Sequence, residues 1–285
     1  MFSAAPTEGS VKIFGNCLVK NEADMIVETL VHAARWCDRI FVFDNGSTDG
    51  TWEKVLELAK RESRVVPFQS ASVPYRDSLR LDTFNRFRSE ASAGDWWCKL
   101  DADELYYDNP REFLAAVPRR HHVVWGVNFQ FYFTDEDAAR WEKNPQAYPP
   151  HTPAEQALRH YRCDWSEVRF FRHRPGLGWN SGSAPRHLGV VHPRRIRFQH
   201  YQYRSPEQIN LRLQTRQQAI ASGCGTFQGY CEETDWRQKI VPAATCHCID
   251  EPNPLRIEEA KLPRHVEPWP ARLAKFCMHG TGLWP

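Results

Sequence analysis

The chain lacks any run of apolar residues long enough to cross a membrane. No window approaches the roughly 18 consecutive apolar residues that a spanning helix needs, and the first residues contain no apolar segment of the signal-peptide kind. Internal repeats and low-complexity segments are also missing, which excludes solenoid and fibrous architectures. We therefore expect a cytoplasmic protein. Peripheral attachment to the inner face of a membrane, through a basic surface, is left open.

A strong net charge and a cysteine framework are missing as well. The formal net charge of +2 over 285 residues gives no general argument for nucleic-acid binding. The nine cysteines are odd in number and scattered, which indicates reduced thiols rather than disulfides. We expect Cys17, Cys37 and Cys98 to be small core residues. The Cys-x-Cys at Cys246 and Cys248 lacks the spacing typical of structural zinc.

Strands and helices alternate along the first hundred residues. With 41% apolar and 13% aromatic residues, the chain can form a sizeable core. Alternation of this kind predicts an α/β fold whose parallel sheet is covered by helices on both faces. The periodicity predicts strands at 11–19, 39–44, 65–68 and 96–101, and helices at about 23–36, 51–62 and 79–93.

The pattern becomes irregular after Asp103. Composition predicts a short helix at 110–117, a strand at 123–133, and a polar flap with four prolines at 134–160. A short strand at 168–171 and a helix at 207–221 follow. Ser205 as N-cap and Pro206 as first helical position indicate the start of this helix. From residue 240 onward the prolines and weak periodicity predict an extended tail over the body.

The most informative motif is the pair of carboxylates that ends the strand at 96–101. Asp101 and Asp103 are one residue apart, so an extended chain places both on the same side. Two carboxylates this close repel each other unless a cation lies between them, and oxygen ligands suit Mg²⁺ or Mn²⁺. A solvated polar turn explains the same spacing, and the pattern alone does not decide between the two.

Two earlier strands also end in polar residues, Asn21-Glu22 after the first and Asp44-Asn45 after the second. In open α/β sheets ligands bind at the carboxyl ends of parallel strands. The charge distribution adds a second indication: residues 95–112 hold six acids against two bases, and residues 159–216 hold twelve arginines against three acids. An acidic metal-binding end facing an arginine-rich end suits a phosphorylated ligand.

These residues together resemble the family 2 glycosyltransferases of the GT-A fold. The resemblance covers about residues 11–135 and rests on four fragments in order: Asn21-Glu22, the run from Asp44 to Gly50, Phe84-Asn85-Arg86, and Asp101-Ala102-Asp103-Glu104. It implies a Rossmann-like, mostly parallel sheet with an irregular C-terminal acceptor region. We accordingly divide the chain into a flexible leader (1–10), a nucleotide-sugar-binding half (11–135), an acceptor-binding and catalytic half (136–239) and an extended tail (240–285).

The resemblance also implies roles for single residues. Asp44 would contact the base or ribose of the donor, with Asn21, Glu22 and Asn85 in the same pocket. Asp101 would reach the ribose or a metal-bound water, and Asp103 would ligate the Mn²⁺ or Mg²⁺. The family often adds a late histidine to the metal or diphosphate, and His200 is the best candidate, with His192 in reserve.

Two further roles follow from the chemistry of sugar transfer. The leaving diphosphate needs cationic donors, and Arg169, Arg172 and Arg204 are plausible clamps, although for any one of them an ordinary surface arginine is the commoner explanation. An inverting transfer needs a base beside the acceptor hydroxyl. The usual acidic signature is absent here, and we choose Glu167 over Asp164, a solvated strand-edge acid being the plain alternative. Trp165 and Trp179 could stack on a sugar or pack in the core.

The expected function is metal-dependent transfer of a sugar, from a UDP-sugar as the commonest donor, to a hydroxyl of a saccharide, a lipopolysaccharide core or another glycan, as in polysaccharide biosynthesis. A nucleotide-sugar-binding module without turnover is one alternative. A nucleotidyltransferase is another, but the first strand is not followed by a glycine-rich phosphate loop. A phosphatase with a nucleophilic Asp is disfavoured by Glu104 and by the motif's place on the fourth strand. We expect Asp103→Ala to abolish donor binding at little cost in stability, because the residue follows a strand end.

Overall fold

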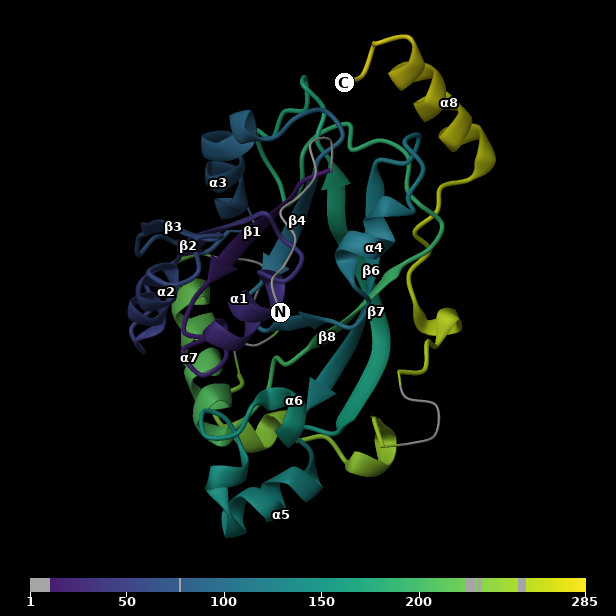
Figure 1. Cartoon of the computed structure of the whole chain (residues 1–285). Coiled ribbons are helices and arrows are strands. Elements are labelled where there is room, and N and C mark those ends of the chain that lie inside the picture. The colour runs from purple at the N-terminus through teal and green to yellow at the C-terminus, as the bar shows by residue number, and fades with distance from the viewer. Residues whose placement is uncertain (1–10, 77, 224–228, 230–231, 251–254) are drawn as a thin grey trace, which may run out of the picture.

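The computed structural model describes residues 11–76, 78–223, 229, 232–250 and 255–285. The predicted leader at 1–10 lies outside these residues. Within them one mixed sheet runs through the molecule in the order β3-β2-β1-β4-β7-β6-β8-β5, with β9 added to β7 (Figure 1). Strands from both predicted halves of the chain therefore share one sheet.

The first part of the sheet is parallel, as the alternating pattern predicts. Its strands are β1 (Ile13–Val19), β2 (Arg39–Asp44), β3 (Val65–Ser70) and β4 (Trp96–Asp101). β1 pairs with β2 and β4, and β2 pairs with β3, all in parallel. The carboxyl ends of β1 and β4 thus lie side by side, with Leu18 opposite Asp101.

The second part of the sheet is mixed. It contains β5 (Glu104–Tyr106), β6 (Val123–Tyr132), β7 (His160–Arg172), β8 (Ile196–His200) and β9 (His247–Cys248). β7 runs antiparallel to both β4 and β6, and β8 is parallel to β6. β5 pairs antiparallel with β8, with Glu104 opposite His200. This pairing brings the chain after Asp103 next to His200.

Helices cover both faces of the parallel part. α1 (Ile26–Ala33) and α2 (Thr51–Ala59) pack on one face, where alternate residues of β1 and β4 meet Trp36, Ile40 and Phe170. α3 (Leu79–Phe87) packs on the other face, against Phe14, Phe41 and Trp97. Trp96 and Trp97 point to opposite faces because side chains alternate along a strand. The α/β class with helices on both faces is confirmed.

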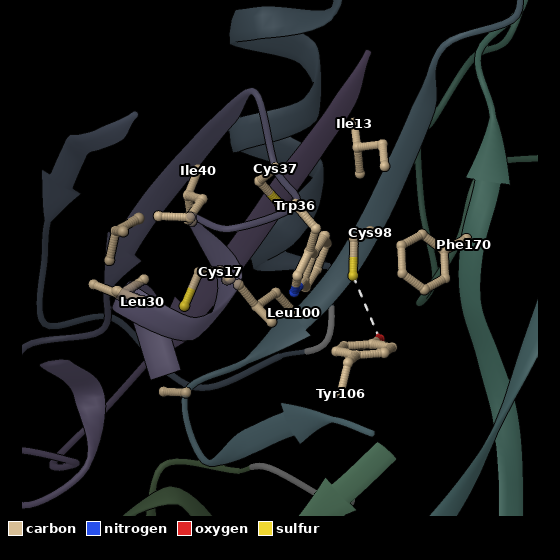
Figure 2. Packing of buried hydrophobic residues seen from close by; sticks show 14 of the residues in the cluster. Ile13, Cys17, Leu30, Trp36, Cys37, Ile40, Cys98, Leu100, Tyr106 and Phe170 are labelled. Carbon is tan, nitrogen blue, oxygen red and sulfur yellow. Dashed lines mark hydrogen bonds between the residues drawn. The ribbon is translucent and has the colours of Figure 1, made fainter. Parts of the chain in front are cut away.

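Figure 2 shows the core between β1, β4 and the helices on the first of these faces. Cys17, Cys37 and Cys98 are free and fully or almost fully buried in it, as predicted. The Sγ of Cys98 lies 3.5 Å from the hydroxyl of Tyr106, the contact drawn dashed in Figure 2. Burial raises the pKa of the Cys98 thiol to about 12, so the residue behaves as an apolar core group.

The remaining helices are α4 (Pro110–Ala115), α5 (Asp135–Lys143), α6 (Ala154–Ala157), α7 (Pro206–Ala221) and α8 (Trp269–Gly280). α4 and α7 are close to prediction. The flap at 134–160 instead holds α5 and α6, and α5 begins at a capping box between Thr134 and Asp137. The tail is not extended throughout, because it contains α8. No helix among the described residues has the length and apolar character needed to span a bilayer.

Candidate active site

A cavity of about 450 Å³ opens at the carboxyl ends of β1 and β4. This is where open α/β sheets bind ligands. The segment from Ser72 to Tyr75 forms one side and α7 forms another. The polar lining side chains, those of α7 included, are Lys20, Asn21, Glu22, Asn45, Arg80, Asp101, Asp103, His200, Gln202, Arg212, Thr215, Arg216, Gln218 and Ser222.

Asn21, just after β1, makes hydrogen bonds to two other segments near the cavity. Its φ of 56° lies in the left-handed region, which asparagine tolerates better than most residues. The side-chain oxygen accepts from the amide of Thr48 at 2.8 Å, and the side-chain nitrogen donates to Thr215 Oγ1 of α7 at 3.0 Å. Asn21 thus lines the cavity and fixes α7 against the loop after β2; its contact with a donor stays a prediction.

Asp44 organises the loop after β2 from underneath. It is fully buried, and its carboxylate accepts from the amides of Gly46 and Ser47 at 3.1 Å and from Ser70 Oγ at 2.7 Å. Gly46 has a φ of 71°, and a Cβ there would meet Ser72 at 2.7 Å, so the turn requires glycine. Asn45, not Asp44, lines the cavity. A direct donor contact of Asp44 stays a prediction.

Asp101 is held by two arginines from different elements. Its carboxylate pairs with Arg80 of α3 and, at 2.9 Å, with Arg169 of β7. Burial opposes ionisation of Asp101, but Arg80 and Arg169 outweigh it, and its pKa lies well below the ordinary value. Arg169 is 1% exposed and also pairs with Glu104. Asp101 is therefore an anion fixed by buried guanidinium groups.

Asp103 lies deeper than its place after β4 suggests. It is 4% exposed, with Arg212 of α7 at 2.5 Å and His200 Nε2 at 3.3 Å from its oxygens. Burial alone would raise the pKa of Asp103, but the nearby His200 and Arg212 outweigh this effect and hold it well below its ordinary value. The premise that Asp103 lies outside the core is therefore wrong.

We expect Asp103→Ala to lower the free energy of unfolding by about 3 kcal/mol, because it leaves Arg212 without one of its two buried partners. Urea unfolding measures this change. Asp250→Ala is the matched control, since Asp250 is 61% exposed and pairs with Arg159 at the surface, where an ion pair contributes less than about 1 kcal/mol. Equal stability changes for the two variants would contradict the buried pairing.

Glu22 completes a buried ion-pair network between the end of β1 and α7. Arg204 donates to Glu22 at 2.5 Å and to Asp24 at 2.7 Å, and Arg212 bridges Glu22 and Asp103 at 2.5 Å to each. Arg204 is fully buried. It orients carboxylates below the cavity and does not line it, so its predicted role as a diphosphate clamp stays a prediction.

Sequence reasoning missed Arg80, Arg212 and Arg216, the arginines that line the cavity among the described residues. Arg212, Thr215, Arg216 and Ala219 occur at helical spacing on one face of a predicted helix, and this signal could have identified them. Arg172, another predicted clamp, instead donates to carbonyls of Gly94, Val117 and His121, near the amino ends of β4 and β6.

Asp103 and His200 are suited to share a divalent metal. Adjacent ligands of an octahedral ion with bonds of about 2.1 Å lie roughly 3.0 Å apart, close to the 3.3 Å between Asp103 Oδ1 and His200 Nε2. Asn128 Nδ2 lies 3.2 Å from His200 Nδ1, and the buried Asn128 Oδ1 has no hydrogen-bond partner among the described residues. Rotating this amide would let Oδ1 accept from Nδ1–H and free Nε2 for a metal.

No cluster of three or more His, Cys, Asp or Glu side chains in the described part of the chain is arranged as a complete metal site. Further ligands would have to come from the substrate or water, as is usual for Mg²⁺. Asp101 directs its oxygens to Arg80 and Arg169, so its part in metal binding stays a prediction. His192 lies elsewhere, with its ring 5.2 Å from that of His121.

Of the two candidate bases, Glu167 is near the carboxylate pair. It is 33% exposed and lies 3.9 Å from Lys99 and 3.8 Å from Arg169. Burial raises its pKa, Lys99 lowers it, and Asp101 is close enough to raise it further. Asp164 is exposed on the same strand. Its charge raises the pKa of Tyr132 and of Cys163, which do not line the cavity.

The other predicted contacts are placed away from the cavity. Asn85 donates to the carbonyl of Trp179 at 3.1 Å, and its predicted donor contact stays a prediction. Trp179 is fully buried against Phe84 and Phe171, which confirms core packing. Trp165 is 54% exposed, so stacking on a sugar stays open for it.

Residues 18–74 match the model of the family described as glycosyl transferase family 2. This part of the chain is therefore similar to glycosyl transferase family 2. The match contains Asn21-Glu22 and the run from Asp44 to Gly50, and confirms the resemblance there. Asn85 and the Asp101–Asp103 motif lie beyond it. No curated protein matches the chain.

Solved structures of glycosyltransferases are similar at low identity. The mannosyltransferase PcManGT from Pyrobaculum calidifontis, in complex with GDP-Man and Mn²⁺, is 17% identical with a TM-score of 0.43, covering 78% of this chain and 67% of that chain. S. aureus TarS 1-349, in complex with UDP, is 16% identical with a TM-score of 0.31, covering 42% of this chain and 36% of that chain.

Proposed function

We propose that the protein transfers a sugar from a nucleoside diphosphate donor to a hydroxyl of a saccharide or glycolipid acceptor. One observation carries this proposal: the cavity at the carboxyl ends of β1 and β4 presents Lys20, Arg80 and Arg212 beside Asp101 and Asp103, in a chain whose first strands match a glycosyltransferase family. Cations suit the diphosphate, and the carboxylates suit a metal or the hydroxyls of the ribose.

The base of the donor would lie toward Asn45 and the Ser72–Tyr75 segment, at the end of the cavity away from His200. The diphosphate would then meet Arg80 and Arg212, whose positions are already fixed by Asp101, Asp103 and Glu22. Such preorganised cations stabilise the growing charge of the leaving group without reorganising in the transition state. Asp103 and His200 would hold a divalent metal, which supplies further neutralisation of the diphosphate when bound.

Glu167 would act as the base of an inverting transfer. Its carboxylate takes the proton of the acceptor hydroxyl, the acceptor oxygen bonds to the anomeric carbon, and the bond from that carbon to the diphosphate breaks with its electron pair on the leaving oxygen. The partly buried Lys99 and the buried Arg169 keep the carboxylate oriented. Replacing the acceptor by water gives donor hydrolysis by the same steps.

The test is a turnover assay with UDP- and GDP-sugars, with Mn²⁺ or Mg²⁺, over a panel of glycan acceptors. We expect release of the nucleoside diphosphate with formation of a glycoside, and slower release without acceptor. Binding of donor with no release across the panel would favour a nucleotide-sugar-binding module instead. Release of pyrophosphate from a nucleoside triphosphate and a sugar phosphate would indicate a nucleotidyltransferase.

A further inference from the structure

α8 presents several of its apolar side chains outward, although Phe276 and Met278 are half-buried. None of its twelve residues is buried, and Trp269, Leu273 and Cys277 form an exposed stripe at a spacing of four residues. Trp269 is 69% exposed and Leu273 45%, and Leu283 just beyond the helix is 71% exposed. A surface helix ordinarily turns its apolar stripe to the core, so this stripe is suited to an external partner.

Polar contacts on the inner side attach α8 to the body. Lys275 donates to the carbonyl of Gly189 at 2.9 Å and pairs with Glu267. The ring of His279 lies 4.6 Å from that of His122, which directly precedes β6. The apolar stripe is therefore held outward by a fixed set of contacts. Figure 1 shows α8 (yellow) at the edge of the molecule away from α7.

Five arginines belong to the same region as the stripe: Arg264 and Arg272 lie beside Trp269, and Arg120 lies with Arg272 near His121. Arg194 lies near His192, whose ring contacts that of His121, and Arg119 precedes Arg120 in the sequence. Arg264 and Arg272 line, with Trp269, an open hollow of about 530 Å³. Arg120 and Arg272 are both near His121, whose pKa is lowered to about 4 by burial, His192 and these two cations. Arg194 lies over the ring of Phe113 in α4.

These arginines are not neutralised within the described part of the chain. No carboxylate of the described residues lies within ion-pair distance of any of the five, whereas the nearby Glu259 and Glu267 are paired with Arg195 and Lys275. We name the α8 surface as the stripe Trp269, Leu273, Cys277 and Leu283 together with these five arginines. It combines exposed apolar groups with a net positive charge.

We propose that the α8 surface docks on an anionic lipid bilayer. Tryptophan and leucine enter the interfacial region while guanidinium groups meet lipid phosphates, the arrangement of interfacial amphipathic helices. A second copy of the chain is disfavoured, because symmetric contact would bring five arginines against five. A nucleic acid would use the arginines but leave Trp269 and Leu273 without an apolar partner.

The α8 surface is separate from the cavity. α8 contacts His122 and Gly189 near the amino end of β6, whereas the cavity lies at the carboxyl ends of β1 and β4. Substitutions on α8 therefore leave nucleotide binding unchanged, and lipid binding can be measured whether or not the proposed transfer reaction is confirmed.

The experiment is flotation of the full chain with vesicles of phosphatidylcholine alone, or with about a third of phosphatidylglycerol. We expect binding to the anionic vesicles only, weakened by salt, and lost in Leu273→Glu. Leu56→Glu, at a site 42% exposed on α2, is the matched control and binds like the parent. Each of Arg264→Gln and Arg272→Gln weakens binding about fivefold.

Three results would overturn the proposal. The first is equal binding to neutral and anionic vesicles, and the second is undiminished binding of Leu273→Glu. The third is a concentration-dependent dimer in solution that Leu273→Glu abolishes, which would assign the stripe to a second copy. Circular dichroism of each variant confirms that the fold is retained.

Discussion

Arg212→Ala is expected to abolish binding of the nucleotide-sugar donor and to lower the free energy of unfolding by about 3 kcal/mol. Arg212 lines the cavity and is 2.5 Å from both Glu22 and Asp103. Burial disfavours its charge, but these two carboxylates more than compensate and raise its pKa above the ordinary value. Its removal leaves two buried carboxylates short of a cation and takes a cationic donor from the diphosphate.

Urea unfolding and a donor-binding titration measure the two effects. Arg237→Ala is the control, because Arg237 is 66% exposed, pairs with Asp235 nearby in sequence and lies over the ring of Trp236. Exposed contacts of this kind contribute less than about 1 kcal/mol, so both properties should stay near those of the parent. If Arg212→Ala binds the donor as tightly as the parent, the diphosphate lies elsewhere. If its stability matches that of Arg237→Ala, the buried network does not hold α7.

Glu167→Gln is expected to lower kcat by roughly 10²–10⁴-fold while leaving donor affinity unchanged. The amide keeps the size of the side chain but cannot accept the proton of the acceptor hydroxyl. Initial rates at saturating donor, with a separate binding titration, distinguish the two parameters. Asp164→Asn, on the same strand but exposed, should retain the parent rate. A full rate for Glu167→Gln with a reduced rate for Asp164→Asn would move the role to Asp164.

The transfer rate should also fall at low pH, and the pKa of Glu167 should determine the pH at which it falls. The base acts as the carboxylate, and burial raises its pKa above the ordinary glutamate value of 4.5. The rate is therefore lost as pH falls through this raised pKa, earlier than for an exposed glutamate. In Glu167→Gln the remaining rate should lose this acid limb. Persistence of the same limb would assign it to another group.

Local patterns were sufficient to predict the parallel part of the fold. Buried strands of period two and helices of period 3.6 alternate up to Asp101, and β2 and β4 begin and end at the predicted residues. The side chains after β1 and β4 accordingly meet at one cavity. α5 and α8 were missed because polar and proline-rich composition obscured short helices whose starts depend on capping or on Pro270.

The partners of the site carboxylates were not predictable in the same way. Arg212 is 109 residues from Asp103 and 190 from Glu22, so their pairing depends on how α7 packs, which no local pattern encodes. Arg169 and Arg204 were selected for charge, yet both are buried below the cavity. Sequence identifies which residues can bind a phosphate, and tertiary packing decides which of them are already committed to carboxylates.

The most direct test of the central claim is a calorimetric titration of the protein with UDP, GDP and their sugar conjugates, with and without Mn²⁺. The account predicts saturable binding of at least one nucleoside diphosphate by the parent chain and by Arg237→Ala, and no binding by Arg212→Ala. Absence of heat from every nucleotide with the folded parent protein, in both the presence and the absence of Mn²⁺, would contradict the assignment of the cavity as a nucleotide-sugar site.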